Sequence, residues 1–293
     1  MEYLGPYKSV NKLSPKVSIC VPTYQHASYV RQCLENILKQ RTNFPFEIII
    51  GEDESSDGTR DICIEYAEKY PHKIRLFLRN RRDMIKIYGR PTGRYNFIEN
   101  IKAARGKYIA ICEGDDFWTD TMKLQKQHDF METYPDYSAC LHDADIYSER
   151  TNRIIGSYSS TKPFNRMWKE KNYLELSDIL QYWHAGPTAS FFFRNIITTF
   201  PSWMYKIYGG DTGLMILLAQ KGRIGLEKSK MSVYRFENSQ SLTGQDRISA
   251  TTVALHKIRE SFYLMGHLGF RANIFLWKRI GWQFLVAIRN ILR

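Results

Sequence analysis

The sequence predicts an α/β fold with a mostly parallel central sheet flanked by helices. Four short apolar runs in the first half are bounded by turn residues, as strands buried on both faces of a parallel sheet are. They are residues 17–21, 48–50, 74–78 and 108–112. Segments with helical spacing of apolar residues separate these runs, and that alternation is typical of βαβ units.

The helices of the first half follow from residue spacing. Apolar residues within 29–38 recur at steps of three and four, and Asp57-Gly58 introduces a second helical segment at residues 59–70. Residues 79–93 are basic and contain Gly and Pro, so we expect a loop that crosses the sheet edge.

The second half mixes helices and strands. We expect a helix over residues 119–133 that Pro135 stops, because proline cannot continue a helix. A strand is expected at residues 188–193, followed by a helix over residues 212–221 that Gly222 closes. No internal repeat or clean linker divides the 293 residues, which suit one large domain or two small ones.

The five cysteines predict a reducing compartment. Their number is odd and no two form a CxxC pair, so we expect buried thiols and no structural zinc. They are Cys20, Cys33, Cys63, Cys112 and Cys140. The first fifteen residues have neither a basic nor an apolar region, and we expect no signal peptide.

Three carboxylates, those of Glu113, Asp115 and Asp116, directly follow the fourth apolar run. In an open α/β sheet the carboxyl ends of the strands open onto the ligand crevice. Carboxylates this close repel one another, so a divalent cation that offsets their charge and holds a diphosphate would explain the cluster. The residues alone leave an alternative open, which is a polar loop with an acidic helix start at Asp116 or Asp120.

The C-terminal segment is basic and amphipathic. Residues 250–293 hold seven Lys or Arg and one Glu, which is +6 of the net charge of +12. At helical spacing, three basic residues share one face, opposite an apolar stripe. The basic residues are Arg271, Lys278 and Arg289, and the stripe is Leu276, Ile280, Phe284, Ala287 and Ile291. The pattern predicts binding to an anionic membrane surface or, alternatively, packing on the domain or on a second subunit.

Three segments, in order and at the expected spacing, resemble glycosyltransferase family 2. They are VSICVPTYQHASYVRQCLENILKQ, FEIIIGEDESSDGT and GKYIAICEGDDFW. The resemblance covers roughly residues 16–240 and implies a GT-A fold, which is a Rossmann-like sheet with an acceptor-side extension. It also implies inverting transfer of a sugar from a nucleotide-diphosphate donor, with Mn²⁺ or Mg²⁺ as the cofactor.

By the same resemblance, the chain divides according to function. We expect an N-terminal arm, a nucleotide-sugar-binding half, an acceptor-binding and catalytic half, and a basic amphipathic helical tail. These are residues 1–15, 16–118, 119–245 and 246–293.

The base-binding part of the implied donor site lies at two strand ends. Pro22, at the end of the first run, is implied as a nucleotide contact, and Tyr24, two residues later, matches the family residue that contacts uracil. Asp53 matches the aspartate that reads the base. An ordinary turn with a half-buried tyrosine remains the alternative for Tyr24.

The acidic cluster supplies the implied metal site. Asp115 matches the metal-binding end of the family's Asp-x-Asp motif, and Glu113 replaces its first aspartate. Glu113 and Gly114 are implied as nucleotide contacts, and Asp116 as a group that supports the metal site or caps a helix.

Catalysis is implied at Asp211, which matches the aspartate of the family's Glu-Asp motif although Gly210 replaces the glutamate. Asp211 would be the general base, and the alternative is a helix cap. Arg235 would contact a phosphate or, equally, anchor its strand to a buried carboxylate. Trp183 and His184 are expected to form an acceptor-side wall, with an aromatic core cluster as the alternative.

The function implied is transfer of a sugar from a nucleotide-diphosphate donor, with uridine favoured, to a glycan or lipid-linked acceptor in cell-surface polysaccharide synthesis. We expect a cytoplasmic protein at the inner face of the membrane. A nucleotidyltransferase is less expected, because PTYQHASY has no glycine-rich phosphate loop. Nucleic-acid binding is also less expected, because no such motif accompanies the basic tail.

Overall fold

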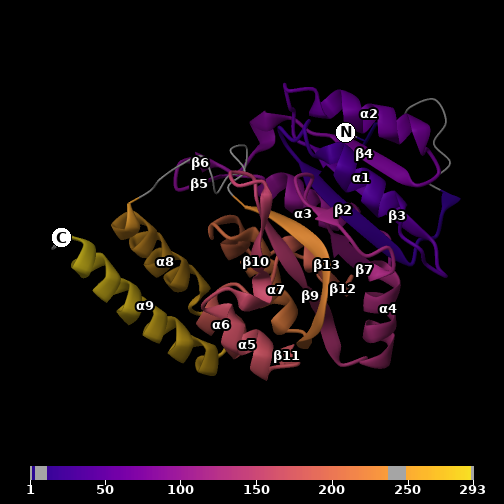
Figure 1. Ribbon diagram of the computed structural model, residues 1–293. Coiled ribbons are helices and arrows are strands. Elements are labelled where there is room, and N and C mark those ends of the chain that lie inside the picture. The colour runs from indigo at the N-terminus through magenta and orange to yellow at the C-terminus, as the bar shows by residue number, and fades with distance from the viewer. Residues whose placement is uncertain (1, 4–11, 237–248, 292–293) are drawn as a thin grey trace.

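The computed structural model describes residues 2–3, 12–236 and 249–291 of the chain. One sheet runs through the centre and helices cover both of its faces, which makes three layers (Figure 1). The strand order along the main path is β1-β4-β3-β2-β7-β12-β9-β13-β11. The predicted α/β fold class is therefore confirmed.

Four parallel strands form the first half of the sheet, and they correspond to the four apolar runs. They are β2 (Val17–Thr23), β3 (Phe46–Glu52), β4 (Ile74–Leu78) and β7 (Tyr108–Ile111), with the short β1 (Glu2–Tyr3) antiparallel at the edge. β3 and β4 lie on one side of β2, and β7 lies on the other. The chain therefore reverses its direction across the sheet at β2. In open α/β sheets, ligands bind outside the strand ends at such a switch point.

The second half of the sheet is mixed. β12 (Phe192–Arg194) runs antiparallel to β7 and to β9 (Tyr137–Ser148), and β9 runs parallel to β13 (Arg223–Phe236). Three short antiparallel strands complete it, namely β8 (Phe117–Trp118), β10 (Arg153–Ser157) and β11 (Tyr173–Leu174). Because the sheet continues across residue 118, the predicted division there concerns function and not separate folding units.

Two elements of the second half begin later than predicted. The strand expected from residue 188 starts at Phe192, because Ser190 N–H bonds to Pro187 O at 2.9 Å and closes a 3₁₀ turn. The helix expected from residue 119 is α4 (Lys123–Thr133), because Thr119 N–H still bonds to Met231 O of β13 at 3.0 Å. The first difference arises from a local turn, and the second from a contact that is distant in sequence.

The segment expected to be a loop at residues 79–93 is partly ordered. It holds a 3₁₀ turn at Arg81–Asp83 and a small hairpin of β5 (Lys86–Ile87) and β6 (Arg90–Pro91). The segment nevertheless leaves the sheet after β4, as predicted.

The helices form one layer on each face of the sheet. One layer contains α4 together with α1 (Val30–Leu38) and α2 (Thr59–Lys69). The other contains α3 (Arg94–Ala103), α5 (Phe164–Glu170), α6 (Leu176–Tyr182), α7 (Gly210–Ala219), α8 (Ala250–Leu264) and α9 (Phe270–Ile291). Side chains of each strand alternate between the two layers, so Ile19 packs in the first and Cys20 in the second. All five cysteines are buried free thiols, as predicted.

The tail helix α9 lies side by side with α8 and also packs on α6 (Figure 1). Part of the apolar stripe predicted for α9 faces the protein, since Leu276 and Ala287 are buried. Phe284 of the same stripe is 58% exposed, so the predicted stripe does not lie wholly against the domain. The side chain of Ile291 lies outside the described part of the structure. The domain therefore uses one side of α9 and leaves a second apolar side uncovered.

A buried carboxylate fixes the three strands that lead to the candidate site. Glu47 of β3 is fully buried and accepts hydrogen bonds from Ser18 Oγ at 2.7 Å and from Arg105 Nε at 3.0 Å. Arg105 lies in the turn before β7, and its N–H also contacts Ser18 Oγ at 3.0 Å. The network therefore joins β2, β3 and the approach to β7.

We predict that Glu47→Ala lowers the free energy of unfolding by about 3 kcal/mol, because removing one partner of a buried ion pair leaves the other uncompensated. Chemical denaturation measures the change. As a control, Glu170→Ala breaks an exposed pair with Arg166 on α5 and should cost less than about 1 kcal/mol. Equal effects of the two substitutions would contradict this account of Glu47.

Candidate active site

The candidate site lies at the switch point between β2 and β7. Gly114, in the loop after β7, donates its N–H to Pro22 O at 3.1 Å and so holds that loop against the end of β2. A Cβ at position 114 would lie 2.4 Å from Thr23 Oγ1, closer than atoms can approach. The close contact of two chain segments thus explains why glycine is present here.

Tyr24 and Asp53 are brought together by a third residue, Arg81. The guanidinium carbon of Arg81 lies 4.0 Å from the centre of the Tyr24 ring, and Nη1 donates to Asp53 Oδ2 at 2.8 Å. The sequence analysis did not single out Arg81, although it belongs to a basic run directly after β4. A flat ring, a carboxylate and a cation therefore meet at the ends of β2, β3 and β4.

Asp53 has one buried carboxylate oxygen without a hydrogen-bond partner among the described residues. That oxygen is Oδ1, and the residue is only 2% exposed. Burial raises the pKa of Asp53, and the hydrogen bond from Arg81 opposes that rise. Because a buried acceptor without a donor costs free energy, Oδ1 fits a donor brought by a ligand, such as the imide N–H of a base.

Asp115 extends from the same loop toward the turn after β2. Its Oδ2 lies 3.7 Å from His26 Nε2, and His26 Nδ1 lies 3.2 Å from Thr23 Oγ1. Both side chains are partly exposed. His26 was not predicted as a site residue, although it stands in the PTYQHASY segment.

The two other acids of the cluster have partners within the protein. Asp116 is buried and its Oδ1 accepts the N–H of Arg235 at 3.0 Å, which joins the β7–β8 loop to β13. Burial raises the pKa of Glu113 well above its ordinary value, and the carboxylates of Asp115, Asp116 and Asp211 raise it further. A hydrogen bond with the Thr188 side chain acts in the opposite direction. Burial also raises the pKa of Asp116 well above its ordinary value. Four acidic side chains thus lie near one another at the end of β7.

These carboxylates fit a divalent cation that is also held by the nucleotide-sugar substrate. Carboxylate oxygens suit Mg²⁺ and Mn²⁺, and the crowded charge favours a cation. Within residues 12–236 and 249–291, however, no three His, Cys, Asp or Glu side chains are grouped so that they could hold a metal ion alone. Further ligands would come from diphosphate oxygens and water, as is usual for Mg²⁺ bound with a nucleotide.

Arg235 is used by the protein itself. Its Nη1 donates to Asp115 O, its Nη2 donates to Gln32 Oε1, and its Nε lies 3.1 Å from Glu149 Oε1. Of the two roles considered for Arg235, this geometry favours the anchor over the phosphate contact.

Asp211 stands in the first turn of α7 and contacts His184. Gly209 occupies the N-cap position, so Asp211 is not the cap. Its Oδ1 accepts the N–H of Thr212 at 2.7 Å, and its Oδ2 lies 3.1 Å from His184 Nδ1. One oxygen therefore stabilises the helix start while the other is available beside an imidazole.

Trp183 and His184 follow α6 and have different environments. His184 is partly exposed and packs edge-on against the rings of Tyr158 and Phe164. Trp183 adopts a left-handed conformation with φ of 65° and stacks under Arg279 of α9. Of these two residues, only His184 directly contacts Asp211, the predicted general base.

Arg94 holds the segment that leads to Asp211. It is 3% exposed and donates to Met204 O, Ile207 O and Tyr208 O at 3.1, 3.0 and 2.8 Å. A Cβ at Gly210 would lie 3.0 Å from the Arg94 guanidinium carbon, so a glycine suits this approach. The sequence offered no signal for Arg94, because its partners are more than a hundred residues away.

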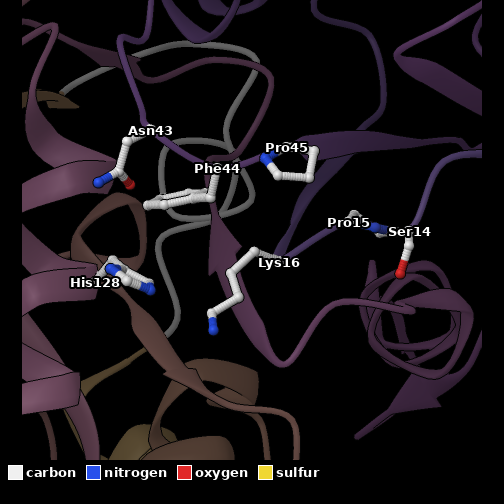
Figure 2. A pocket seen from close by; sticks show the side chains of 7 residues that line it. All are labelled: Ser14, Pro15, Lys16, Asn43, Phe44, Pro45 and His128. Atoms are coloured by element: carbon white, nitrogen blue, oxygen red, sulfur yellow. The ribbon is translucent and has the colours of Figure 1, made fainter.

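A hollow on the opposite edge of the sheet is separate from this site. It lies before β2 and β3, where Lys16, Phe44 and His128 line it (Figure 2). The Phe44 and His128 rings are 4.4 Å apart. None of the residues predicted for the donor, metal or base positions contributes to it.

Comparison with curated proteins gives partial matches. The chain is 39% identical over 133 residues to an uncharacterized protein of Mycobacterium tuberculosis, which is 45% of this chain and 36% of that protein. It is 33% identical over 117 residues to the putative teichuronic acid biosynthesis glycosyltransferase TuaG of Bacillus subtilis, which is 40% of this chain and 42% of TuaG. The matches thus span less than half the length of these relatives.

Solved structures share the fold at low identity. Staphylococcus aureus TarS in complex with UDP-GlcNAc aligns over 94% of this chain and 71% of the TarS chain, with a TM-score of 0.57 and 15% identity. The mannosyltransferase PcManGT of Pyrobaculum calidifontis, in complex with GDP-Man and Mn²⁺, aligns over 96% and 75%, with a TM-score of 0.61 and 15% identity.

The family profile decides the assignment. Residues 18–197, which include β2, β3, β7 and the whole acidic cluster, match the profile of glycosyl transferase family 2. The chain belongs to glycosyl transferase family 2.

Proposed function

We propose that the chain is a metal-dependent inverting glycosyltransferase that moves a sugar from a UDP-sugar to a glycan or lipid-linked acceptor in cell-surface polysaccharide synthesis. Two observations carry the proposal. Tyr24, Arg81 and Asp53 meet at the ends of β2, β3 and β4, and the carboxylates of Asp115 and Asp211 both lie near Glu113. Membership of glycosyl transferase family 2 agrees with it. TuaG, a relative, is named for polysaccharide synthesis.

The base of the donor binds at Tyr24 and Asp53. The Asp53 Oδ1 atom lacks a hydrogen donor, and the N3–H of uracil supplies one. Tyr24 offers its ring to the flat base, on the side where Arg81 now stacks. Arg81 therefore shifts or joins the stack when the base enters. TarS binds UDP-GlcNAc and PcManGT binds GDP-Man, so the fold alone does not choose the base.

Asp115, with His26 beside it, holds Mn²⁺ or Mg²⁺ in this proposal. When bound, the cation supplies positive charge that stabilises the departing diphosphate. Glu113 stays a nucleotide contact, through a ribose hydroxyl or a water. Asp116 supports Asp115 indirectly, because it fixes the loop to β13.

Asp211 serves as the general base. Its carboxylate takes the proton of the acceptor hydroxyl while that oxygen attacks the anomeric carbon, and the bond to the diphosphate oxygen breaks on the opposite face. His184 contacts Asp211 Oδ2 and orients it toward the acceptor side. The acceptor enters next to His184, where the Tyr158 and Phe164 rings offer flat surfaces for a sugar.

We predict that Asp211→Asn lowers turnover by about 10² or more and leaves donor affinity nearly unchanged, because the amide cannot accept the proton. The measurement is release of the nucleoside diphosphate from a UDP-sugar with Mn²⁺, together with the thermal shift that UDP causes. Retained turnover with reduced thermal stability would mean that Asp211 only supports the start of α7.

The second apolar side of α9 carries the proposed membrane contact. We call it the outer stripe, and its residues share one side of the helix at about 100° per residue. It consists of Phe270, Ile274, Trp277, Phe284, Leu285 and Ile288, which are 40 to 82% exposed. Phe262 of α8 adds to it through an edge-on contact with Trp277.

An anionic membrane surface is the partner we propose for the outer stripe. Arg271, Lys278 and Arg289 are exposed along one flank of the stripe, so charge complements an acidic lipid headgroup layer. No helix in the described ranges is long and apolar enough to cross a membrane. The contact would place the enzyme peripherally at the inner face of the cell membrane, next to a lipid-linked acceptor.

We predict that replacing both Trp277 and Phe284 by Ser weakens binding to phosphatidylglycerol vesicles by about tenfold for each aromatic side chain, because each loses apolar burial. Truncation at Phe270 is a poorer test, because it removes the buried Leu276. Vesicle sedimentation measures the binding, and serine at the exposed Ile154 and Ile155 of β10 is the matched control.

Equal sedimentation of the double variant and the native chain would contradict the proposed surface. If the native chain were instead a dimer in light scattering without vesicles, and the double variant a monomer, a second copy of the chain would be the partner.

A further inference from the structure

The α8–α9 hairpin contacts the chain on both sides of Asp211. We propose that Arg279 of α9 is a positioning residue for the catalytic base, acting through Trp183 on one side and Glu260 on the other. The inference rests on the proposed role of Asp211 and adds a control over its position that lies in the tail.

The first connection runs through Trp183. The Arg279 guanidinium carbon lies 3.0 Å from the centre of the Trp183 ring. Trp183 O accepts a hydrogen bond from Thr212 Oγ1 at 2.8 Å, and the next residue, His184, contacts Asp211. Trp183 therefore positions two residues that contact the Asp211 side chain. Thr212 is hydrogen-bonded to Trp183 O, and His184 directly follows Trp183 in the chain. Its left-handed backbone, rare for a residue with a large side chain, must be held by surrounding contacts, of which the Arg279 stack is one.

The second connection runs through Glu260 of α8. Arg279 Nη2 lies 3.6 Å from Glu260 Oε2, and Glu260 Oε1 accepts the N–H of Tyr208 at 2.7 Å. Tyr208 is three residues before Asp211, and its carbonyl is held by Arg94. The backbone before the base is thereby fixed from two directions.

Burial of the Arg279 guanidinium costs free energy of solvation that few hydrogen bonds restore. Its side chain is 9% exposed, and Nε and Nη2 make no hydrogen bond among the described residues. Burial lowers the pKa of Arg279 to about 9, with Glu260 opposing the change, so the guanidinium is still charged at neutral pH. A buried cation with so few hydrogen bonds is a poor contribution to stability alone. The ring of Trp183 and the carboxylate of Glu260 account for its position.

Two variants of Arg279 test the inference. Arg279→Met removes the charge and the planar stack, and Arg279→Lys keeps the charge near Glu260 but not the plane. We expect Arg279→Met to lower turnover at least tenfold while the donor KM changes less than twofold, and Arg279→Lys to recover part of the loss. The readout is release of UDP from a UDP-sugar with Mn²⁺.

A second readout does not depend on activity. Hydrogen exchange of the amides of residues 208–212 should accelerate in Arg279→Met, because both connections are cut. Arg166→Met, which changes an exposed arginine of α5, is the control and should alter neither readout.

The outcomes separate the inference from the proposed function. Turnover within twofold of native in Arg279→Met overturns the inference while the proposed function stands, and so does a parallel loss of donor affinity and turnover. If Arg279→Met does not fold, Arg279→Lys is the variant to measure. Turnover of Arg279→Lys equal to that of the native chain would then overturn the inference. Absence of turnover by the native chain with every UDP-sugar tested instead contradicts the proposed function.

Discussion

Negative charge gathers at the end of β7, and much of the surrounding structure compensates it. Glu113, Asp115 and Asp116 lie within four residues, and Asp211 approaches them from α7. Within this cluster Asp116 accepts the Arg235 N–H and Glu113 interacts with the Thr188 side chain, while burial raises the pKa of both acids well above their ordinary values. Asp115 stands beside an imidazole at the crevice. A cation and the diphosphate of a donor explain why the remaining charge is tolerated.

The fold places the proposed base-binding residues and the Asp211–His184 pair on opposite sides of the acidic cluster. Because β3 and β7 flank β2 as parallel strands, the ends of the three strands lie at one edge of the sheet, and the proposed base-binding residues lie at the ends of β2, β3 and β4. The second helical layer brings Asp211 and His184 to the other side. Tyr88, in the β5–β6 hairpin, stacks on His256 of α8 with ring centres 3.8 Å apart. The α8–α9 hairpin thus touches the segment that follows β4 as well as the chain around Asp211, so one tail element contacts both halves.

The sequence predicted the first half well because strands buried on both faces leave a simple apolar pattern, and three motifs stood at their ends. Prediction from the sequence failed where a residue's contacts are made with residues distant in the chain. The helix expected from residue 119 began at Lys123, since Thr119 N–H still bonds to Met231 O of β13. The meeting of Arg81 with Tyr24 and Asp53 joins three separate loops. For α9, the helical period gave an apolar stripe but could not show which apolar side the domain covers, and it gave no sign that the Arg279 side chain is only 9% exposed.

The central claim is that a nucleotide donor and a divalent cation bind together at the acidic cluster. Its most direct test is the thermal shift of the native chain and of Asp115→Ala with UDP, GDP, ADP and CDP, each with Mn²⁺ or with a chelator. The account predicts a shift of the native chain with UDP that needs Mn²⁺ and is lost in Asp115→Ala, with little response to the other nucleotides. A folded native chain that responds to no nucleotide, or responds equally with the chelator, would contradict it.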